Sequence, residues 1–240
     1  MYFEGKQVRQ ELKYAISEYE YACLRPRLAA AMTLDGNAAT AGEYRITSLY
    51  FDNQQNDAFY EKESGDYRRA KYRIRIYNGE NDMMRLELKE KFGQSTAKTS
   101  CRINPEIYQA VLQNRLLYEA VAEDPFLRLF FLKVKLERLR PCVIVDYVRE
   151  PYIFQSCNVR ITFDKRLRTV VNSVDMFASN QLYLTPSGYG DMILEVKYDD
   201  YLPEFIRRLL AMKQQQKLAI SKYSICRSTK NALNWQEDVL

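Results

Sequence analysis

The sequence predicts an α+β fold centred on a closed β-barrel whose lumen is charged. Nearly every predicted strand is apolar on one face and charged on the other, because side chains alternate across a strand. Arg-x-Arg and Glu-x-Lys pairs stand at strand centres, as in Arg73-Ile74-Arg75, and an ordinary solvated face explains the whole set of strands poorly. Nineteen tyrosines beside eight glycines and one tryptophan also suggest many strands.

The composition limits the class of protein. The 240 residues, 47% of them hydrophobic, suffice for one substantial core, and no repeat, low-complexity segment or flexible linker divides them, so we expect one domain over residues 1–240. The net charge of +5 suits an anionic ligand without requiring one. Five scattered cysteines without a CxxC pair predict reduced thiols in a cytoplasmic protein and no zinc site.

The chain contains no histidine, which excludes histidine-based triads and histidine-ligated metals. Acid–base chemistry would then depend on lysine, tyrosine, carboxylates or water. No apolar run approaches the ~18 residues of a membrane-spanning helix. The N-terminus also lacks the apolar core of a signal peptide.

The first quarter of the chain predicts two strands around a helix. The predicted elements are a strand over 7–16, a helix over 18–32, a loop over 35–42, a strand over 44–52 and a turn or short helix over 53–61. Ser17 and Glu20 form a capping box that begins the helix, and Arg25-Pro26 is expected to interrupt it. In the second strand Ser48, Tyr50 and Asp52 share one face.

A basic hairpin follows, with strands over 71–77 and 85–91. Asn78-Gly79 is a strong turn signal between them. Lys71, Arg73 and Arg75 share one face of the first strand, while the polar face of the second carries Glu87 with basic neighbours. Like charges side by side on a sheet repel one another, so acidic side chains, solvent or an anionic ligand must neutralise this face.

The second half predicts further strands and four helical segments. The predicted strands are a polar strand over 94–101 and strands over 143–152, 159–167 and 192–198. The first two predicted helices are one from Asn104-Pro105 with apolar periodicity to Val121, and one over 125–138 with Leu129, Phe130 and Val134 on its apolar side. A third helix from Pro203 carries Phe205 and Met212, and helical structure is expected to restart after 214–216. Pro141 is expected to end the helical region. Arg160, Thr162, Asp164 and Arg166 share one strand face.

Together the polar faces hold more cations than acids. The cations are Lys13, Lys71, Arg73, Arg75, Lys89, Lys91, Arg149, Arg160 and Lys197, and the acids are Glu11, Glu87, Asp164 and Glu195. Buried cations need compensation, and arginine forks match phosphate oxygens, so a chain of phosphates would suit such a lumen. Glu195 is the best candidate ligand for Mg²⁺ or Mn²⁺, and an ion pair with neighbouring lysines is its alternative role.

Seven motifs stand in the same order as in a known family. They are Glu11–Tyr14, Ile46–Asn53, Lys71–Tyr77, Glu87–Lys89, Val159–Asp164, Leu194–Lys197 and Ser221–Tyr223. Over about residues 6–228 the chain resembles the catalytic domain of the vacuolar transporter chaperone (VTC) polyphosphate polymerases, which are triphosphate tunnel metalloenzymes like the CYTH-type triphosphatases and adenylyl cyclases. The resemblance implies an antiparallel β-barrel tunnel with helices packed outside, and synthesis of polyphosphate from ATP with Mn²⁺ or Mg²⁺.

The resemblance also implies roles for thirteen residues. The expected catalytic residues are Arg73, Arg75, Lys89 and Lys222, the expected phosphate-binding residues are Lys13, Lys62, Lys91, Lys98, Arg149, Arg160, Lys197 and Ser221, and the expected metal ligand is Glu195. Lys71 is the one cation of the hairpin that could be mere surface charge. Two positions depart from the pattern. Lys91 stands where fungal enzymes carry histidine, and Arg9 replaces the first acid of the CYTH signature Glu-x-Glu-x-Lys, which argues against a CYTH triphosphatase.

The expected ligands are ATP, triphosphate or polyphosphate. The regulatory and membrane domains of the fungal polymerases are absent from this sequence, so export, or action at the inner face of a membrane, is expected to need a partner protein. Four alternatives stay open: a tunnel triphosphatase or polyphosphate hydrolase, a non-catalytic polyphosphate or nucleotide sensor, a nucleic-acid binder, and a charge-paired barrel without ligand. Nucleic acid is not expected, because the aromatic residues fall mainly on the strand face opposite the arginines.

Overall fold

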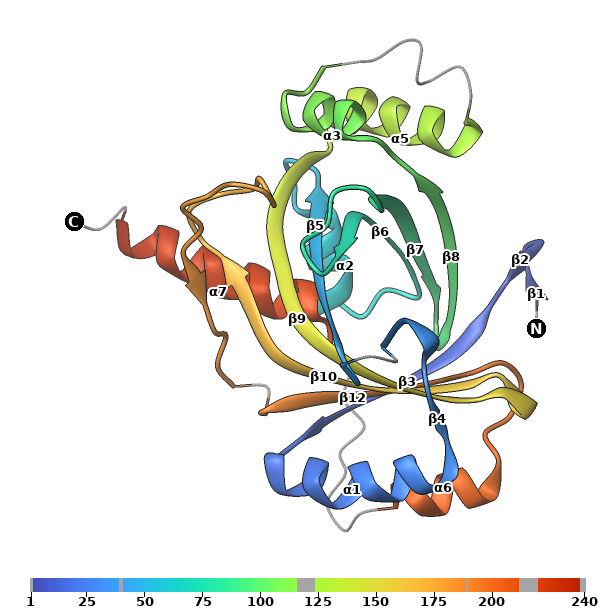
Figure 1. Ribbon diagram of the computed structural model, residues 1–240. Coiled ribbons are helices and arrows are strands. Elements are labelled where there is room, and N and C mark those ends of the chain that lie inside the picture. Colours follow the sequence, from blue (N-terminus) through green and yellow to red (C-terminus); the bar gives the residue numbers. More distant parts are fainter. Residues whose placement is uncertain (1, 39–40, 116–123, 189, 212–219, 238–240) are drawn as a thin grey trace.

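The computed structural model describes residues 2–38, 41–115, 124–188, 190–211 and 220–237. Eight strands form a closed antiparallel ring in the order β10-β12-β3-β8-β7-β6-β5-β9 and back to β10 (Figure 1). They are β3 (Arg9–Ile16), β5 (Tyr44–Asp52), β6 (Arg68–Tyr77), β7 (Arg85–Phe92), β8 (Ser95–Arg102), β9 (Arg140–Phe154), β10 (Val159–Val170) and β12 (Met192–Tyr198). The predicted closed antiparallel barrel and its charged strand faces are confirmed.

One seam of the ring is weakly paired. β3 and β8 share only the residue pairs Arg9–Thr96 and Gln10–Ser95, whereas β3 pairs with β12 over seven residues. Beyond Gln10 the two strands separate, so side chains rather than backbone hydrogen bonds must close this part of the wall. Glu11 and Lys13, which follow on β3, therefore lie beside a gap in the sheet.

The helices pack outside the ring, as expected. α1 (Glu18–Ala31) and α6 (Glu204–Leu210) cover one side, α3 (Pro105–Leu112) and α5 (Pro125–Leu136) cover the opposite side, and α2 (Asp57–Glu63) and α7 (Lys222–Glu237) lie close together (Figure 1). The short elements are β1 (Tyr2–Phe3), β2 (Lys6–Gln7), β4 (Thr33–Leu34), β11 (Tyr183–Leu184) and the 3₁₀ turns η1 (Gly36–Ala38) and η2 (Gln155–Cys157). No helix of the described residues is long and apolar enough to cross a membrane.

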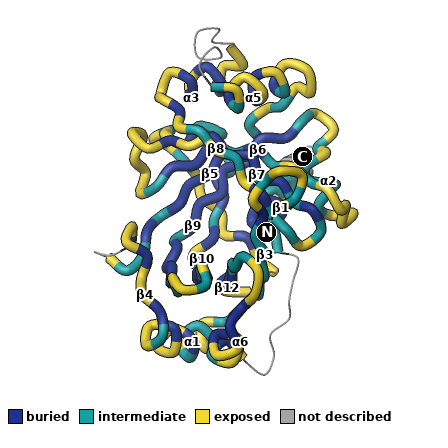
Figure 2. The backbone as a smooth tube through the Cα atoms, turned by 90° about the vertical axis from the view of Figure 1, so that its right-hand side faces the viewer, coloured by how far each residue is buried: buried dark blue, intermediate teal, exposed yellow. Residues whose placement is uncertain are grey.

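Two apolar cores lie between the ring and its helices (Figure 2). Ile74 and Leu86 point outward from β6 and β7 and pack with Phe130 of α5. On the other side, Leu24 of α1 packs with Phe163 of β10. Burying one such side chain stabilises the fold by roughly 1.5–3 kcal/mol, so the apolar faces fix which strand faces turn outward and leave the polar faces to the lumen.

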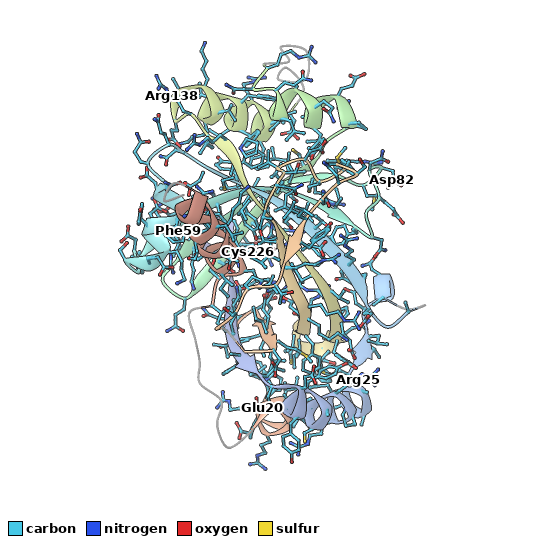
Figure 3. The ribbon with its side chains drawn as sticks, turned by 90° about the vertical axis from the view of Figure 1, so that its left-hand side faces the viewer. Glu20, Arg25, Phe59, Asp82, Arg138 and Cys226 are labelled. Atoms are coloured by element: carbon cyan, nitrogen blue, oxygen red, sulfur yellow. The ribbon has the colours of Figure 1, made fainter. Side chains whose placement is uncertain are left out.

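A third apolar cluster joins α7 to the ring. Tyr223 and Cys226 of α7 are buried with Val143 of β9 and Ile193 of β12, and Phe59 of α2 packs at the edge of the same cluster (Figure 3). All five cysteines are free, as the spacing predicted. One part of the lumen wall is therefore this apolar cluster, which holds α7 against the ring, and the other part is charged. The first residues of α7 lie beside the charged part.

Helix α1 is not interrupted at Pro26, which corrects the expectation from the sequence. The capping box is present, since Ser17 accepts from the backbone N–H of Glu20 at 3.2 Å and the Glu20 carboxylate accepts from the backbone N–H of Ser17 at 2.8 Å. Leu24 and Leu28 are fully buried on either side of Pro26. Two buried leucines offset the ~3 kcal/mol that an interior proline costs a helix.

Several predicted boundaries are also wrong. Helix α3 ends at Leu112 because Asn114 adopts a left-handed φ of 54°, and the expected continuation to Val121 falls outside the described residues. Leu129 is 41% exposed, and the buried side of α5 is Leu127, Phe130, Phe131 and Val134. Pro141 lies inside β9, next to a register shift in its pairing with β5, where a missing donor is tolerated. Phe205 is exposed on α6, and Met212 is not among the described residues.

Arg166 does not share a face with Arg160 and Asp164. A register shift in the pairing of β10 with β9 falls between Lys165 and Arg168, and Arg166 has a φ of 54°. This bulge turns the exposed Arg166 side chain out of the alternation. The strict period of two therefore holds only up to residue 165 of this strand.

Candidate functional site

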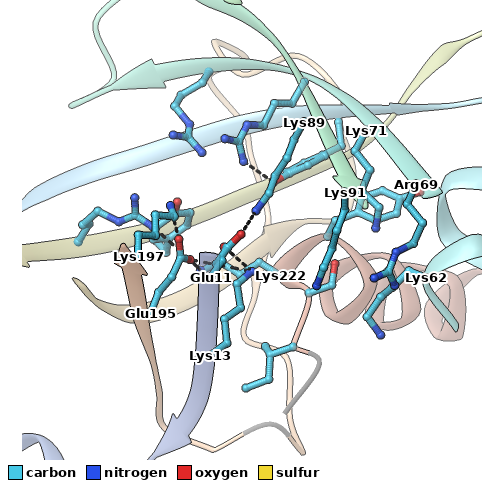
Figure 4. Close-up of a pocket in the computed structure, with 18 of the residues that line it drawn as sticks. Glu11, Lys13, Lys62, Arg69, Lys71, Lys89, Lys91, Glu195, Lys197 and Lys222 are labelled. Carbon is cyan, nitrogen blue, oxygen red and sulfur yellow. Dashed lines mark hydrogen bonds and ion pairs between the residues drawn. The ribbon is translucent and has the colours of Figure 1, made fainter. Parts of the chain in front are cut away.

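A cavity of about 350 Å³ lies inside the ring, beside the first residues of α7 (Figure 4). Its lining is Glu11, Lys13, Tyr50, Lys62, Arg69, Lys71, Arg73, Arg75, Lys89, Lys91, Gln94, Tyr147, Arg149, Glu195, Lys197, Ile220, Ser221, Lys222 and Tyr223. Eleven of these residues are lysine or arginine and two are glutamate. Glu87 and Asp164 are two further buried carboxylates next to this lining. When they are counted as well, cations still exceed carboxylates by seven among the described residues.

Arg73 and Arg75 differ in how firmly the protein holds them. Arg73 donates from Nε to Glu87 at 2.8 Å and from Nη1 to the Tyr50 hydroxyl at 2.9 Å. Arg75 reaches Ser48 at only 3.4 Å and lies 3.7 Å from Glu87. Burial alone would raise the pKa of Glu87, but Arg73 and Arg75 lower it far below its ordinary value. Arg75 therefore keeps more of its guanidinium available for an anion in the lumen.

Two lysines meet at Glu11 beside the weak seam. Lys89 of β7 donates to Glu11 of β3 at 2.5 Å, and Nζ of Lys13 lies 3.2 Å from the other carboxylate oxygen. Burial would raise the pKa of Glu11, but Lys13 and Lys89 lower it to about 2. The Lys89 contact spans the gap where β3 and β8 no longer pair, so one ion pair both closes the wall and positions two lumen cations.

Glu195 lies among four cations. Lys197 forms an ion pair with it, and Nζ of Lys13, Nη2 of Arg149 and Nζ of Lys222 lie 3.9, 3.8 and 3.7 Å from Oε2. Burial would raise the pKa of Glu195, but Lys197 and the other cations lower it well below its ordinary value. The group is therefore ionised, and it holds the cations in place as much as they hold it.

Asp164 fixes the remaining part of this network. Its carboxylate accepts two hydrogen bonds from Arg149, at 2.7 and 2.8 Å, and forms an ion pair with Lys222 of α7. Ser221 accepts from the backbone N–H of Ser224 at 3.3 Å, so it caps the first turn of α7. The start of α7 is thus part of the lumen wall.

Eleven of the thirteen residues that the resemblance implied line this cavity, and Lys98 and Arg160 do not. The side chain of Lys98 is 53% exposed, and its Nζ lies 3.2 Å from Glu87. Arg160 donates hydrogen bonds to Asp35 at 2.5 Å and to the Tyr44 hydroxyl at 2.8 Å. Nothing in the polar 35–42 segment signalled that Asp35 would be buried.

The variant Asp35→Asn tests what Arg160 does. We expect the free energy of unfolding to fall by about 1–3 kcal/mol, because Arg160 loses its charged partner. If the released guanidinium binds phosphate, tripolyphosphate will raise the melting temperature of the variant more than that of the wild type. Urea unfolding and thermal melts with and without tripolyphosphate measure both effects. Equal shifts in the two proteins would leave Arg160 with a purely structural role.

The tyrosines of the lumen contradict the expected separation of aromatic and basic side chains. The ring of Tyr50 lies under Arg73 at 5.7 Å, and that of Tyr147 lies 5.4 Å from Arg149 and 4.8 Å from Lys222. Tyr147 stands two residues before Arg149 on β9, so strand alternation could have found it, and Tyr50 faces Arg73 in the register of β5 and β6. They are cation–π partners that share the cations with the carboxylates.

Lys71 is a lumen residue and not surface charge. It lines the cavity with its Nζ 4.3 Å from the centre of the Tyr223 ring. The Tyr223 hydroxyl donates to Asp52 at 2.5 Å, and Asp52 also accepts from the backbone N–H groups of Ala58 and Phe59 in α2. Lys71 therefore lies where α2 and α7 are tied together.

The donor set for a divalent metal is small. Among the described residues no three His, Cys, Asp or Glu side chains come together. Glu11 and Glu195 are the two carboxylates on the cavity, and both approach Lys13. Buried Oε1 of Glu11 accepts no well-directed hydrogen bond. Mg²⁺ commonly uses one or two carboxylates together with substrate phosphates, so this pair fits a metal that arrives with its substrate.

The comparisons with known proteins agree with this geometry. A family model described as the VTC domain matches residues 8–230. Curated protein sequences give no match. A structure from Hippeastrum, a candidate adenylyl cyclase with a dominant triphosphatase activity, is similar at 16% identity and a TM-score of 0.54, covering 92% of this chain and 96% of that one. A candidate adenylate cyclase from Bacillus halodurans is 13% identical over 85% of this chain and 87% of its own, with a TM-score of 0.50. These likenesses show the fold.

Proposed function

Because the chain belongs to the VTC domain family, we propose that it is a polyphosphate polymerase that transfers the γ-phosphate of ATP to a growing inorganic polyphosphate chain. The observation that carries the proposal is the enclosed surplus of cations over carboxylates in the cavity. Buried cations without counter-charges are costly, so the cavity is best explained by a polyanion that completes it. ATP as donor also makes the cytoplasm the proposed site of the reaction.

In the proposed reaction a terminal oxygen of the acceptor chain forms a bond to the γ-phosphorus. The bond from that phosphorus to the β–γ bridging oxygen breaks, and ADP leaves with this oxygen. Arg75, which is held less closely than Arg73, offers its guanidinium to the transferred phosphoryl group, and Lys89 and Lys222 hold neighbouring phosphates. Positioning and charge stabilisation supply most of the rate enhancement in such a loose transition state.

A divalent metal, Mn²⁺ or Mg²⁺, would be held by Glu195 together with Glu11. When bound, it would neutralise charge on the phosphate oxygens. The protein's own part is to keep both carboxylates ionised, and the lysines around them do so by lowering their pKa values. With the metal held by the carboxylates, the same lysines would be available to phosphate oxygens.

The cavity suits a phosphate acceptor better than water. Glu11 and Glu195 are engaged by lysines, and the chain has no histidine, so neither a free carboxylate nor an imidazole is available in the described lining to activate water. A terminal phosphate needs no strong base, because its oxygens are already largely ionised near neutral pH. This favours chain elongation over hydrolysis as the main activity.

Incubation of the protein with ATP and Mn²⁺ or Mg²⁺ tests the proposal. We expect long-chain polyphosphate and ADP in amounts that increase together, resolved by gel electrophoresis and nucleotide chromatography. Orthophosphate as the only product would instead identify a triphosphatase. Tight binding of tripolyphosphate with neither product would identify a sensor.

A further inference from the structure

Four cations of the cavity form a group of their own, here called the outer cluster: Lys62, Arg69, Lys71 and Lys91. They lie together beside α2, away from Glu11 and Glu195 (Figure 4). In the parts of the chain that the structure describes, Arg69, Lys71 and Lys91 have no carboxylate within ion-pair distance, and Lys62 has only the half-exposed Glu63 at 3.6 Å. Every other cation of the lining has a buried carboxylate partner.

The sheet register makes this arrangement unfavourable without a ligand. Arg69 faces Lys91 and Lys71 faces Lys89 directly across β6 and β7. Like charges directly opposite one another destabilise an antiparallel pair. One acidic side chain at any of these positions would relieve the repulsion, as Glu87 does opposite Arg73. An anion that binds here relieves the repulsion between these cations, and this relief adds to its binding free energy.

The outer cluster also continues the row of catalytic arginines. Residues 69, 71, 73 and 75 alternate on the lumen face of β6, and two residues of a strand span about 6.6 Å. The row is therefore long enough to contact a linear ligand over about 20 Å, from Arg75 inside the ring to Arg69 beside α2. A compact anion such as orthophosphate spans only one interval between neighbouring side chains of this row.

We propose that the outer cluster is a separate subsite for inorganic polyphosphate, which holds the part of the chain remote from the reacting end and directs it out of the ring past α2. This inference rests on the proposed polymerase function. The chemistry favours a bare phosphate chain over the nucleoside of ATP. Among the described residues, the lining of this end offers no carboxylate for ribose hydroxyls, and Lys71 already covers the face of the Tyr223 ring.

Binding of chains of two lengths tests the proposal without any turnover. We expect Lys71→Met and Arg69→Gln each to weaken the binding of polyphosphate of about 20 phosphates roughly tenfold, because each removes one charge-assisted contact. Tripolyphosphate, which the inner cations can hold alone, should change less than about twofold. Isothermal titration calorimetry measures both ligands, with Arg208→Gln, at an exposed arginine of α6, as the control.

The outcomes separate this subsite from the polymerase assignment. Both variants should melt at or above the wild-type temperature without ligand, because a like-charge contact has been removed. An equal loss of affinity for both chain lengths, or none for either, would refute the subsite even if the protein makes polyphosphate. A selective loss for the long chain would support the subsite even if the protein proves to be a hydrolase.

The pH dependence of long-chain binding tests Lys71, in comparison with a variant that stays charged. Burial lowers the pKa of Lys71 to about 7, and Lys13, Lys62 and Arg69 add to the effect. A bound polyanion favours the charged form, so affinity should be full below pH 7 and fall as the pH rises above it. The groups that face Lys71 are Lys13 on β3, Asp52 on β5, Lys62 on α2, Arg69 on β6, Lys89 and Lys91 on β7, and Tyr223 on α7.

The variant Lys71→Arg provides the matched control for this titration, because arginine stays charged at every relevant pH. We expect it to bind the long chain with near wild-type affinity at pH 6 and to lose less affinity than the wild type between pH 6 and pH 8. An unchanged slope would show that the titrating group is another one and would remove Lys71 from the subsite.

Discussion

Replacement of Arg75 by glutamine is expected to lower polyphosphate synthesis by about a hundredfold to a thousandfold. Arg75 is held less closely than Arg73, since it lies 3.4 Å from Ser48 and 3.7 Å from Glu87 and also contacts Tyr77. Its removal takes a preorganised charge from the phosphoryl group being transferred. Since Arg73 still pairs with Glu87, the buried carboxylate keeps a close partner and the ring should stay folded.

Two companion variants sharpen this experiment. Arg75→Lys keeps the charge but loses the planar fork, so we expect it to recover only part of the rate. Arg208→Gln removes an exposed arginine of α6 and should be indistinguishable from the wild type. The rate of ADP release at saturating ATP and the circular dichroism spectrum are measured for each. Wild-type synthesis by Arg75→Gln would contradict the proposed role of the arginine row.

The charged ring could be predicted from the sequence because a strand has a period of two. Once Ile74 and Leu86 are assigned to the core, Arg73 and Glu87 must face the lumen. The register that places Arg73 opposite Glu87 is set by the longer connection over residues 78–84, and a two-residue turn at Asn78-Gly79 would not give it. Local rules therefore assign the strand faces but not the exact pairing.

Contacts between distant segments could not be predicted in this way. Asp35 accepts a hydrogen bond from Arg160, which is 125 residues away in the sequence, and no local pattern marks Asp35 as buried. Tyr223 reaches Asp52 across 171 residues and sets the place of α7. Alternation placed Lys71 on the same face as Arg73 and Arg75, but it could not show that the side chain is enclosed, because that depends on α2 and α7 at the end of the hairpin.

The weak seam between β3 and β8 explains why the carboxylates of the lumen are not spread evenly. Lys89 must reach across a gap to be held, and Glu11 on β3 is the acid that meets it. Glu195 faces Lys13 in the register of β12 and β3, so the two glutamates gather on the side of the seam. The end of the β6–β7 hairpin at Arg69 and Lys91 carries cations only, so the charge of the lumen is unevenly distributed among the described residues.

Glu195→Gln should separate binding from turnover. We expect synthesis to fall at least about a hundredfold, because a proposed metal ligand is lost, while the charge of the cavity becomes one unit more positive. Tripolyphosphate binding without metal should therefore be kept or tightened, since Lys197, Lys13 and Lys222 lose a competing anion. Calorimetry with and without Mn²⁺ measures this split, because only the wild type should gain affinity from the metal.

The matched control is Glu204→Gln, which removes an exposed glutamate of α6 that pairs with the surface arginines Arg207 and Arg208. It should change neither turnover nor the effect of Mn²⁺ on binding. If Glu195 served only to hold its lysines, Glu195→Gln would weaken tripolyphosphate binding to the same extent with and without Mn²⁺, since misplaced cations bind phosphate poorly under either condition. A loss that depends on Mn²⁺ is the result that a metal ligand, and not a structural ion pair, requires.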